Sequence, residues 1–94
     1  MYHVYVLYST KLDSFYKGHT SDLNQRLKRH NAGRERYTKK GTPWRLIWST
    51  EKETKSEAYK LEIKLKNLSR ARLYGFMMKD SNGIVSLDEL LLLK

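Results

Sequence analysis

The sequence predicts a small domain of the mixed α/β (α+β) class, in which helices flank an antiparallel three-stranded sheet in the order β-β-α-β-α-α. Two observations predict it. Residues 4–19 carry a β-branched and aromatic hairpin pattern, and residues 56–78 are rich in helix-forming residues. A length of 94 residues suits one core. We expect a main domain over residues 1–80, with a turn and a short helix over residues 81–94.

The first strand is predicted over residues 4–8, which are β-branched and aromatic. In a strand, side chains alternate between the two faces. Tyr5 and Leu7 then face one side, and Val4, Val6 and Tyr8 face the other. Residues 11–14 form a short turn, and residues 15–19 return as the second strand of a hairpin.

A helix, a loop and a third strand are predicted next. Ser21 is the expected N-cap of the helix, with Asp22 favourable at its positive end, and the helix stops before Gly33. Residues 33–42 are polar and basic and predict a loop. Residues 44–49 alternate between two faces as a strand does. One face carries Trp44, Leu46 and Trp48, and the other carries Arg45, Ile47 and Ser49.

Residues 56–68 fit two periodicities. Tyr59, Leu61, Ile63 and Leu65 alternate as in a strand, whereas Ala58, Leu61, Leu65 and Leu68 follow helical spacing. Because Lys, Glu, Leu and Ala favour helices, we predict a helix. A second short helix follows over residues 69–78 and a turn over residues 80–83. Ser86 and Glu89 have the capping-box spacing that opens a last helix.

The chain is strongly basic: 19 Lys and Arg against 10 Asp and Glu give a net charge of +9. Such an excess on a small domain indicates a polyanionic partner, most often nucleic acid. An acidic membrane surface normally needs an amphipathic helix or a lipid anchor, and neither stands out. A solvated basic surface is the ordinary alternative. The excess is concentrated in eight residues: Arg26, Lys28, Arg29, Arg34, Arg36, Lys39, Lys40 and Arg45.

Several classes of protein are excluded. There is no cysteine, so disulfides, thiolate nucleophiles and Cys-based zinc sites are ruled out. The longest apolar run, Leu90 to Leu93, is far shorter than the roughly 20 residues of a membrane span. No secretory signal is visible, and we expect a cytoplasmic protein. The three histidines match no metal motif. Residues 78–89 resemble a calcium loop but begin with Met78, which has no oxygen ligand in its side chain.

Three features point to chemistry, and each has an ordinary alternative. Glu62 falls about 40° from Ala58 on a helical projection, inside or beside the apolar stripe, where it needs a partner unless it bends out to solvent. Arg26 and His30 are four residues apart and share a helix face suited to phosphate binding and proton transfer, or simply solvated. The hairpin tyrosines, including Tyr5 and Tyr16, are otherwise amphipathic core.

Together these residues form a recognisable order. His3-Val4-Tyr5 precedes Tyr16-Lys17-Gly18, Arg26 and His30 follow on the helix, and Glu62 lies on the later helix. This order over residues 2–73 resembles the GIY-YIG nuclease family, in particular its small stand-alone bacterial members. His3-Val4 replaces Gly-Ile, Lys17 replaces Ile, and His19 stands where many relatives carry lysine. Tyr74 stands where several relatives carry asparagine.

The resemblance implies a set of roles for the matching residues. Tyr5 and Tyr16 match the two motif tyrosines, Arg26 the helix arginine, and His30 the histidine or tyrosine that follows it. Glu62 matches the glutamate that binds one Mg²⁺ or Mn²⁺ ion. Tyr5 would take a proton from the attacking water, with cationic neighbours to lower its pKa from about 10. Gly18 and His19 are supporting residues, and Lys17, Arg29, Arg34, Arg36, Lys39 and Lys40 are expected to contact nucleic acid.

The resulting expectation is a metal-dependent endonuclease that hydrolyses DNA phosphodiester bonds. We expect any selectivity to be for DNA structure, in a repair-related role. The alternative is a nucleic-acid-binding module of the same fold that cuts poorly or not at all, which Tyr74 in place of asparagine favours. A protein-interaction role is a third hypothesis. Nothing in the sequence indicates a membrane or an obligate protein partner.

Overall fold

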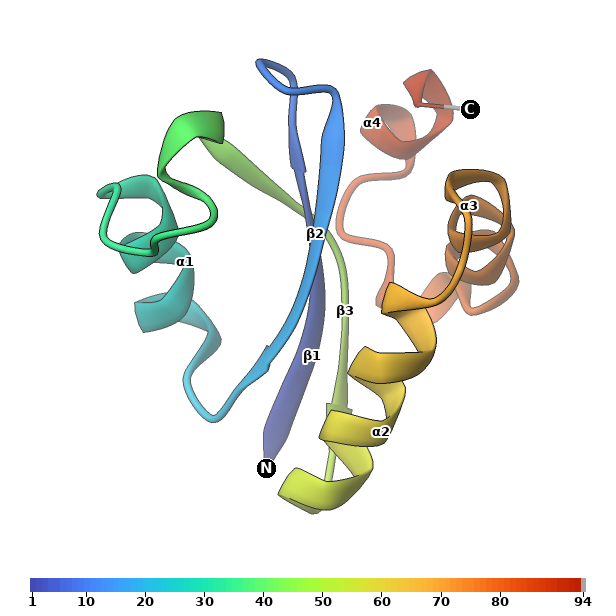
Figure 1. Ribbon diagram of the computed structural model, residues 1–94. Helices are drawn as coiled ribbons and strands as arrows, with labels where there is room; N and C mark the ends of the chain where they lie inside the picture. Colours follow the sequence, from blue (N-terminus) through green and yellow to red (C-terminus); the bar gives the residue numbers. More distant parts are fainter. Residues whose placement is uncertain (94) are drawn as a thin grey trace.

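Three antiparallel strands form one sheet, in the order β2-β1-β3, in the computed structural model, which describes residues 1–93. The sheet separates α1 on one face from α2, α3 and α4 on the other (Figure 1). This architecture confirms the predicted fold class. None of the helices in the described part of the chain is long and apolar enough to cross a membrane. The elements are β1 (Tyr2–Ser9), β2 (Ser14–Thr20), α1 (Leu23–Asn31), the 3₁₀ helix η1 (Lys39–Gly41), β3 (Trp44–Lys52), α2 (Lys55–Lys66), α3 (Arg70–Lys79), the 3₁₀ helix η2 (Ser81–Gly83) and α4 (Leu87–Leu92).

Each face of the central strand β1 supports its own hydrophobic cluster. Tyr5 and Leu7 pack under α1, as their alternation predicts, together with Trp44. Val4, Val6 and Tyr8 lie on the opposite face, also as predicted. The sheet is therefore buried on both sides, and its central strand carries almost no exposed side chain. The second cluster is completed by Ile47, Trp48, Ala58, Leu65, Leu73, Met77 and Leu90.

The predicted alternation of β3 is wrong at Trp48. Val6 of β1 pairs with Trp48, but Leu7 pairs with Leu46, so Ile47 is an extra residue on β3. Such a β-bulge changes the face that the following side chains occupy. Ile47 and Trp48 both join the cluster under α2 to α4, while Leu46 packs with the cluster under α1. The indole N–H of Trp48 donates to the carbonyl oxygen of Asp80 at 2.9 Å.

The N-cap of α1 is Asp22, not Ser21. Its carboxylate accepts a hydrogen bond from the backbone N–H of Gln25 at 3.0 Å. Its own backbone N–H donates to the Thr20 hydroxyl oxygen at 3.1 Å, which links the end of β2 to the start of the helix. A carboxylate is favoured at this position because it also faces the positive end of the helix dipole.

The predicted helix over residues 56–68 is confirmed, and the strand alternative is wrong. Ala58 and Leu65 are buried, whereas Tyr59 and Ile63, which a strand would place on the same face as Leu65, are exposed. Ser86 caps α4, as its spacing predicts. The helix α2 therefore turns one face toward β1 and β2, and Glu62 lies on that buried face.

Candidate functional site

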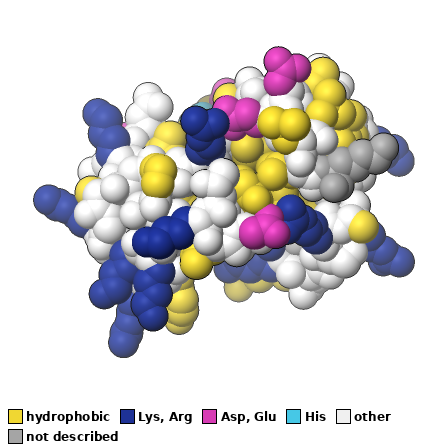
Figure 2. Space-filling view, turned by 90° about the horizontal axis from the view of Figure 1, so that it is seen from above, with side chains coloured by type: hydrophobic (Ala, Val, Ile, Leu, Met, Phe, Trp, Pro, Cys, Tyr) yellow, Lys and Arg dark blue, Asp and Glu magenta, His cyan; other side chains and the backbone are white. Residues whose placement is uncertain are grey.

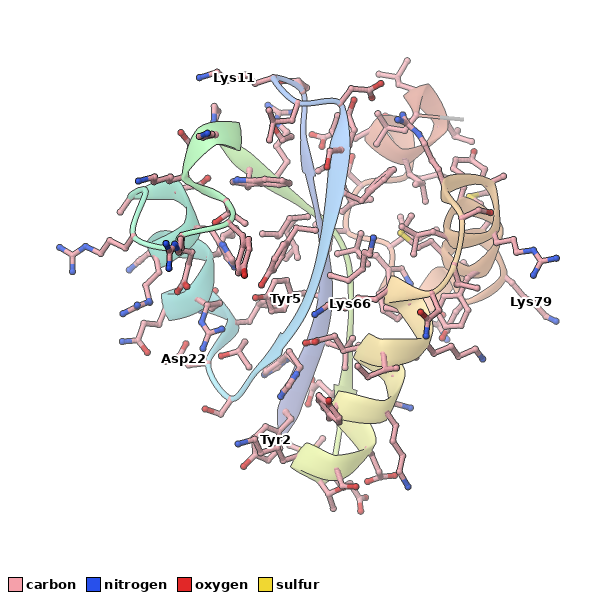
Figure 3. All side chains as sticks on the ribbon, in the orientation of Figure 1. Tyr2, Tyr5, Lys11, Asp22, Lys66 and Lys79 are labelled. Carbon is pink, nitrogen blue, oxygen red and sulfur yellow. The ribbon has the colours of Figure 1, made fainter. Side chains whose placement is uncertain are left out.

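Tyr5 lies at the centre of the cluster under α1 and is 1% exposed. It pairs with Gly18 across the two strands of the hairpin. A Cβ atom at position 18 would lie 2.6 Å from the Tyr5 hydroxyl oxygen and 2.8 Å from its Cζ atom. Gly18 is thus the residue that leaves room for the Tyr5 ring, and any side chain there would displace it. Figure 3 shows Tyr5 between the sheet and α1.

A buried hydrogen-bond chain runs from Tyr5 into the loop after α1. The Tyr5 hydroxyl lies 3.0 Å from Nε2 of His30, and Nδ1 of His30 lies 2.7 Å from the Thr38 hydroxyl. That hydroxyl donates to the carbonyl oxygen of Glu35 at 3.5 Å, so it can accept a hydrogen bond from Nδ1–H. We therefore assign the imidazole proton to Nδ1, which leaves the lone pair of Nε2 to accept from Tyr5.

Burial sets the protonation state of this chain. It raises the pKa of the Tyr5 hydroxyl well above its ordinary value, with Tyr16 as a second cause, while the nearby Arg26 guanidinium opposes the rise. Burial also lowers the pKa of His30 below its ordinary value. Both groups are consequently neutral at pH 7. The cationic neighbours that a Tyr5 base was expected to need do not outweigh its burial.

Tyr16 and Arg26 lie beside the hydrogen-bond chain from Tyr5 to Thr38. The Tyr16 ring centroid lies 4.9 Å from that of His30 and 6.3 Å from that of Tyr5. Arg26 is four residues before His30 on α1, and its side chain is 37% exposed, with Nε 3.9 Å from Glu35 Oε1. The guanidinium is therefore accessible to an anion beside the buried tyrosine. Its five N–H donors suit a phosphate group.

The hydrogen-bond chain, with Tyr16 and Arg26 beside it, is the first part of the site. The second part is centred on Glu62, which is 7% exposed. Nδ1 of His19 lies 2.7 Å from Oε1, and Nζ of Lys66 lies 2.9 Å from Oε2. The alternative in which Glu62 bends out to solvent is wrong. Lys66 extends from α2 toward the sheet (Figure 3). Lys66 is not among the predicted site residues, although its i,i+4 spacing from Glu62 is a signal for such a pair.

The two parts meet around β2, which is an edge strand. Tyr16 packs with the cluster under α1, whereas His19 contacts Glu62 on α2, so β2 supplies residues to both parts. Burial raises the pKa of Tyr16, the charge of Lys66 lowers it, and the charge of Glu62 raises it further. Tyr16 therefore lies within the electrostatic reach of both α2 residues.

The donor set fits one hard divalent cation. Among residues 1–93, no group of three or more His, Asp or Glu side chains is placed to hold a metal ion. Glu62 provides a single carboxylate. Mg²⁺ is commonly held by one or two carboxylates and several waters, so Glu62 is a suitable ligand. Lys66 would have to leave Oε2 to admit the ion there.

The other basic residues that are predicted to contact nucleic acid divide into two groups. Lys17 is half-buried on β2, and burial and the nearby Lys66 lower its pKa. The others are exposed on the end of α1, on the loop that follows it and on η1. Figure 2 shows Lys and Arg side chains gathered on this side, and hydrophobic side chains on the side of α4. This second group consists of Arg29, Arg34, Arg36, Lys39 and Lys40.

Comparisons with known proteins agree with this architecture. A UPF0213 protein of Halobacterium salinarum is 40% identical over 73 residues, which cover 77% of this chain and 94% of that protein. The UPF0213 protein YazA of Bacillus subtilis is 38% identical over 82 residues, 86% of this chain and 83% of the relative. The solution NMR structure of a UPF0213 protein from Bacillus halodurans is similar, with a TM-score of 0.55 and 32% identity. The match covers 83% of this chain and 84% of that one.

A family model described as the GIY-YIG catalytic domain matches residues 1–75. This stretch includes both motif tyrosines, Arg26, His30 and Glu62. The resemblance seen in the sequence is therefore confirmed. The chain belongs to the GIY-YIG nuclease family, and its relatives are the small single-domain UPF0213 proteins.

Proposed function

We propose that the protein is a divalent-metal-dependent endonuclease that hydrolyses DNA phosphodiester bonds in the cytoplasm, in a repair-related role. The observation that carries this proposal is the chain from Tyr5 through His30 to Thr38, with the accessible Arg26 beside it and Glu62 across β2. It combines a proton acceptor, a phosphate-binding cation and a carboxylate, which are the groups that phosphodiester hydrolysis requires.

The buried chain provides a route for the proton of the attacking water. The water gives one proton to the Tyr5 oxygen, while the Tyr5 hydroxyl proton passes to Nε2 of His30. His30 becomes an imidazolium whose Nδ1–H is held by Thr38. The resulting hydroxide attacks phosphorus, the bond from phosphorus to the leaving sugar oxygen breaks, and that oxygen takes up a proton from solvent, while His30 later returns its extra proton to solvent. Because Tyr5 receives a proton as it gives one, it never carries a full charge, and its raised pKa does not block the step.

The other residues act on the phosphate. Arg26 neutralises and orients a non-bridging oxygen through its guanidinium. Glu62 would hold the Mg²⁺ or Mn²⁺ ion, which supplies Lewis-acid stabilisation to the scissile phosphate when bound. Lys66, once separated from Oε2 of Glu62, is a second cation for the non-bridging oxygens of the phosphate. Tyr16 borders this region and orients the water between the two parts of the site.

The second candidate function is a nucleic-acid-binding module that cuts weakly or not at all. One observation favours it: His19 and Lys66 already engage both oxygens of Glu62. Tyr74 in place of asparagine points the same way. Such a module would use Arg26 and the exposed basic residues for phosphate contacts without turnover.

Cleavage assays separate the two functions. The purified protein is incubated with flapped, nicked and linear DNA in Mg²⁺ or Mn²⁺, beside Glu62→Ala and Glu62→Gln. We expect metal-dependent cutting by the unmodified protein, and none above background by either variant. If the unmodified protein cuts no substrate with either ion but still binds DNA, the binding module replaces the nuclease.

A further inference from the structure

Tyr37 is exposed to an unusual degree for an aromatic side chain. It is 88% exposed, more than any other large hydrophobic residue that the structure describes. It lies in the loop between α1 and η1. The phenol ring therefore offers both faces to solvent. Because the ring is not packed in the core, packing does not explain an aromatic residue at this position.

The backbone on both sides of Tyr37 is fixed. The adjacent Thr38 is 1% exposed, and its carbonyl oxygen accepts a hydrogen bond from the indole N–H of Trp44 at 2.6 Å. On the other side, the carbonyl oxygen of Glu35 accepts from the backbone N–H groups of Thr38 and Lys39, at 3.2 and 3.0 Å. Tyr37 is thus presented at a defined place, one residue from the side chain that binds His30.

Exposed cations flank Tyr37 along the chain. Four basic residues of the same loop and of η1 are exposed, and no acidic residue of residues 33–41 other than Glu35 opposes them. Glu35 itself is engaged by Arg29 at 2.8 Å. Exposed aromatic rings interleaved with Lys and Arg are the pattern by which proteins bind single strands, because the cations follow the phosphates while the rings stack on bases. The four cations are Arg34, Arg36, Lys39 and Lys40.

We propose that Tyr37 is a stacking platform for an unpaired base, and that it directs the enzyme to single-stranded or flapped DNA. This inference rests on the proposed function and names its substrate class. In continuous duplex, the faces of the bases are covered by their neighbours, so the ring finds nothing to stack on. Beside an unpaired segment, the base stacks on Tyr37 and the strand continues toward Arg26 and the Tyr5–His30 pair.

Binding without metal tests the platform. The affinity for a labelled oligothymidine and for a fully paired duplex is measured by fluorescence anisotropy at one fixed salt concentration. We expect Tyr37→Ala to weaken single-strand binding about tenfold, the scale of one base–aromatic stack, and Tyr37→Phe to retain it. Duplex binding should change by less than about twofold for both variants. Leu92→Ala is the matched control, since Leu92 is 85% exposed on α4 and should change neither affinity.

Two results would overturn the inference: an unchanged single-strand affinity in Tyr37→Ala, or an equal loss for single strand and duplex. Thermal unfolding checks that the variants fold. The cleavage function fails separately, because it is read from metal-dependent cutting and its loss in Glu62→Gln. A protein that prefers single strands through Tyr37 but never cuts would refute the nuclease and leave the platform standing.

Discussion

The Tyr5 hydroxyl and Nε2 of His30 lie 3.0 Å apart in a part of the protein where both residues are 1% exposed. The pair joins β1 to α1 and links two residues that are separated by 25 positions in the chain. A phenol in such surroundings is a poor base by itself, because burial disfavours its charged form. With a neutral imidazole as its acceptor, it can pass a proton on without becoming a phenolate.

The first prediction concerns this hydroxyl. Tyr5→Phe should lower metal-dependent cleavage at least about a hundredfold, because the water loses its proton acceptor. It should cost about 1–3 kcal/mol of unfolding free energy, because the buried Nε2 of His30 is left without its donor. Tyr8→Phe is the matched control: its hydroxyl bonds Asp13 on the opposite face of the sheet, and cleavage should stay within about twofold. A Tyr5→Phe protein as active as the unmodified one would remove Tyr5 from the mechanism.

A second prediction concerns the space that Gly18 leaves. Gly18→Ala places a methyl group 2.6 Å from the Tyr5 hydroxyl oxygen, so the ring must move. Overpacking of this kind costs about 1–3 kcal/mol and should separate Tyr5 from His30, with loss of cleavage. Gly75→Ala is the control. Residue 75 lies in the middle of α3, and its new methyl group would have open space around it, with no neighbour within 4 Å.

Chemical denaturation distinguishes these two glycine variants. Gly75→Ala should gain up to about 1 kcal/mol, because alanine is the better helix former. Gly18→Ala should lose stability and activity together. Normal values of both for Gly18→Ala would mean that the hairpin adjusts without disturbing Tyr5.

The third prediction concerns the Glu62–Lys66 pair. Calorimetric titration of the DNA-free protein with Mn²⁺ should show binding that Glu62→Gln abolishes, since the charge that holds the ion is gone. Lys66→Met should instead tighten Mn²⁺ binding about two- to fivefold, because a competing ion pair is removed, and an ion pair whose lysine is half-exposed is worth about that much. Weaker Mn²⁺ binding by Lys66→Met would show that Lys66 supports the metal rather than competing with it.

The fourth prediction concerns pH. The pKa of His30 is lower in the folded protein than its ordinary value of about 6.5, so the unfolded chain binds more protons between these two values. The stability that neutral His30 contributes is therefore complete above a pH of about 6.5 and is lost as the pH falls toward the lowered value. Urea unfolding at about pH 7 and about pH 5.5 should show a larger decrease for the unmodified protein than for His30→Gln. Equal decreases would contradict a buried neutral imidazole.

The sequence predicts most of the fold because each element carries a local signal. The hairpin, the helical spacing around Ala58 and the Ser86 cap depend on neighbouring residues only. The bulge at Ile47 has no such local signal. It places Trp48 on the face where the indole reaches Asp80, a residue far along the chain. The predicted cap at Ser21 was one residue early because Thr20 holds the Asp22 backbone.

The candidate site shows the same division. The family motif identifies Tyr5, Tyr16, Arg26, His30 and Glu62, and the fold brings them to the two sides of β2. The partners of these residues required the structure. Thr38 lies in a loop with no motif of its own, and its role follows only from its contact with His30. The burial that raises the pKa of Tyr5 is likewise a property of the packed sheet, because an alternating strand does not reveal how much covers each face.

The last prediction concerns the exposed cations on the loop side. Lys39→Ala combined with Lys40→Ala should weaken binding to all DNA sequences alike, because phosphate groups carry no sequence information. The slope of log affinity against log salt should flatten by about one unit for each phosphate that the double variant no longer neutralises.

Lys79→Ala is the control, since Lys79 projects from the end of α3 on the far side of the sheet (Figure 3) and should leave the slope unchanged. Fluorescence anisotropy between about 50 and about 300 mM salt measures both slopes. An affinity that does not fall with salt, or a slope that Lys79→Ala flattens as much as the double variant, would mean that the loop side is a solvated surface and that DNA binds the protein elsewhere.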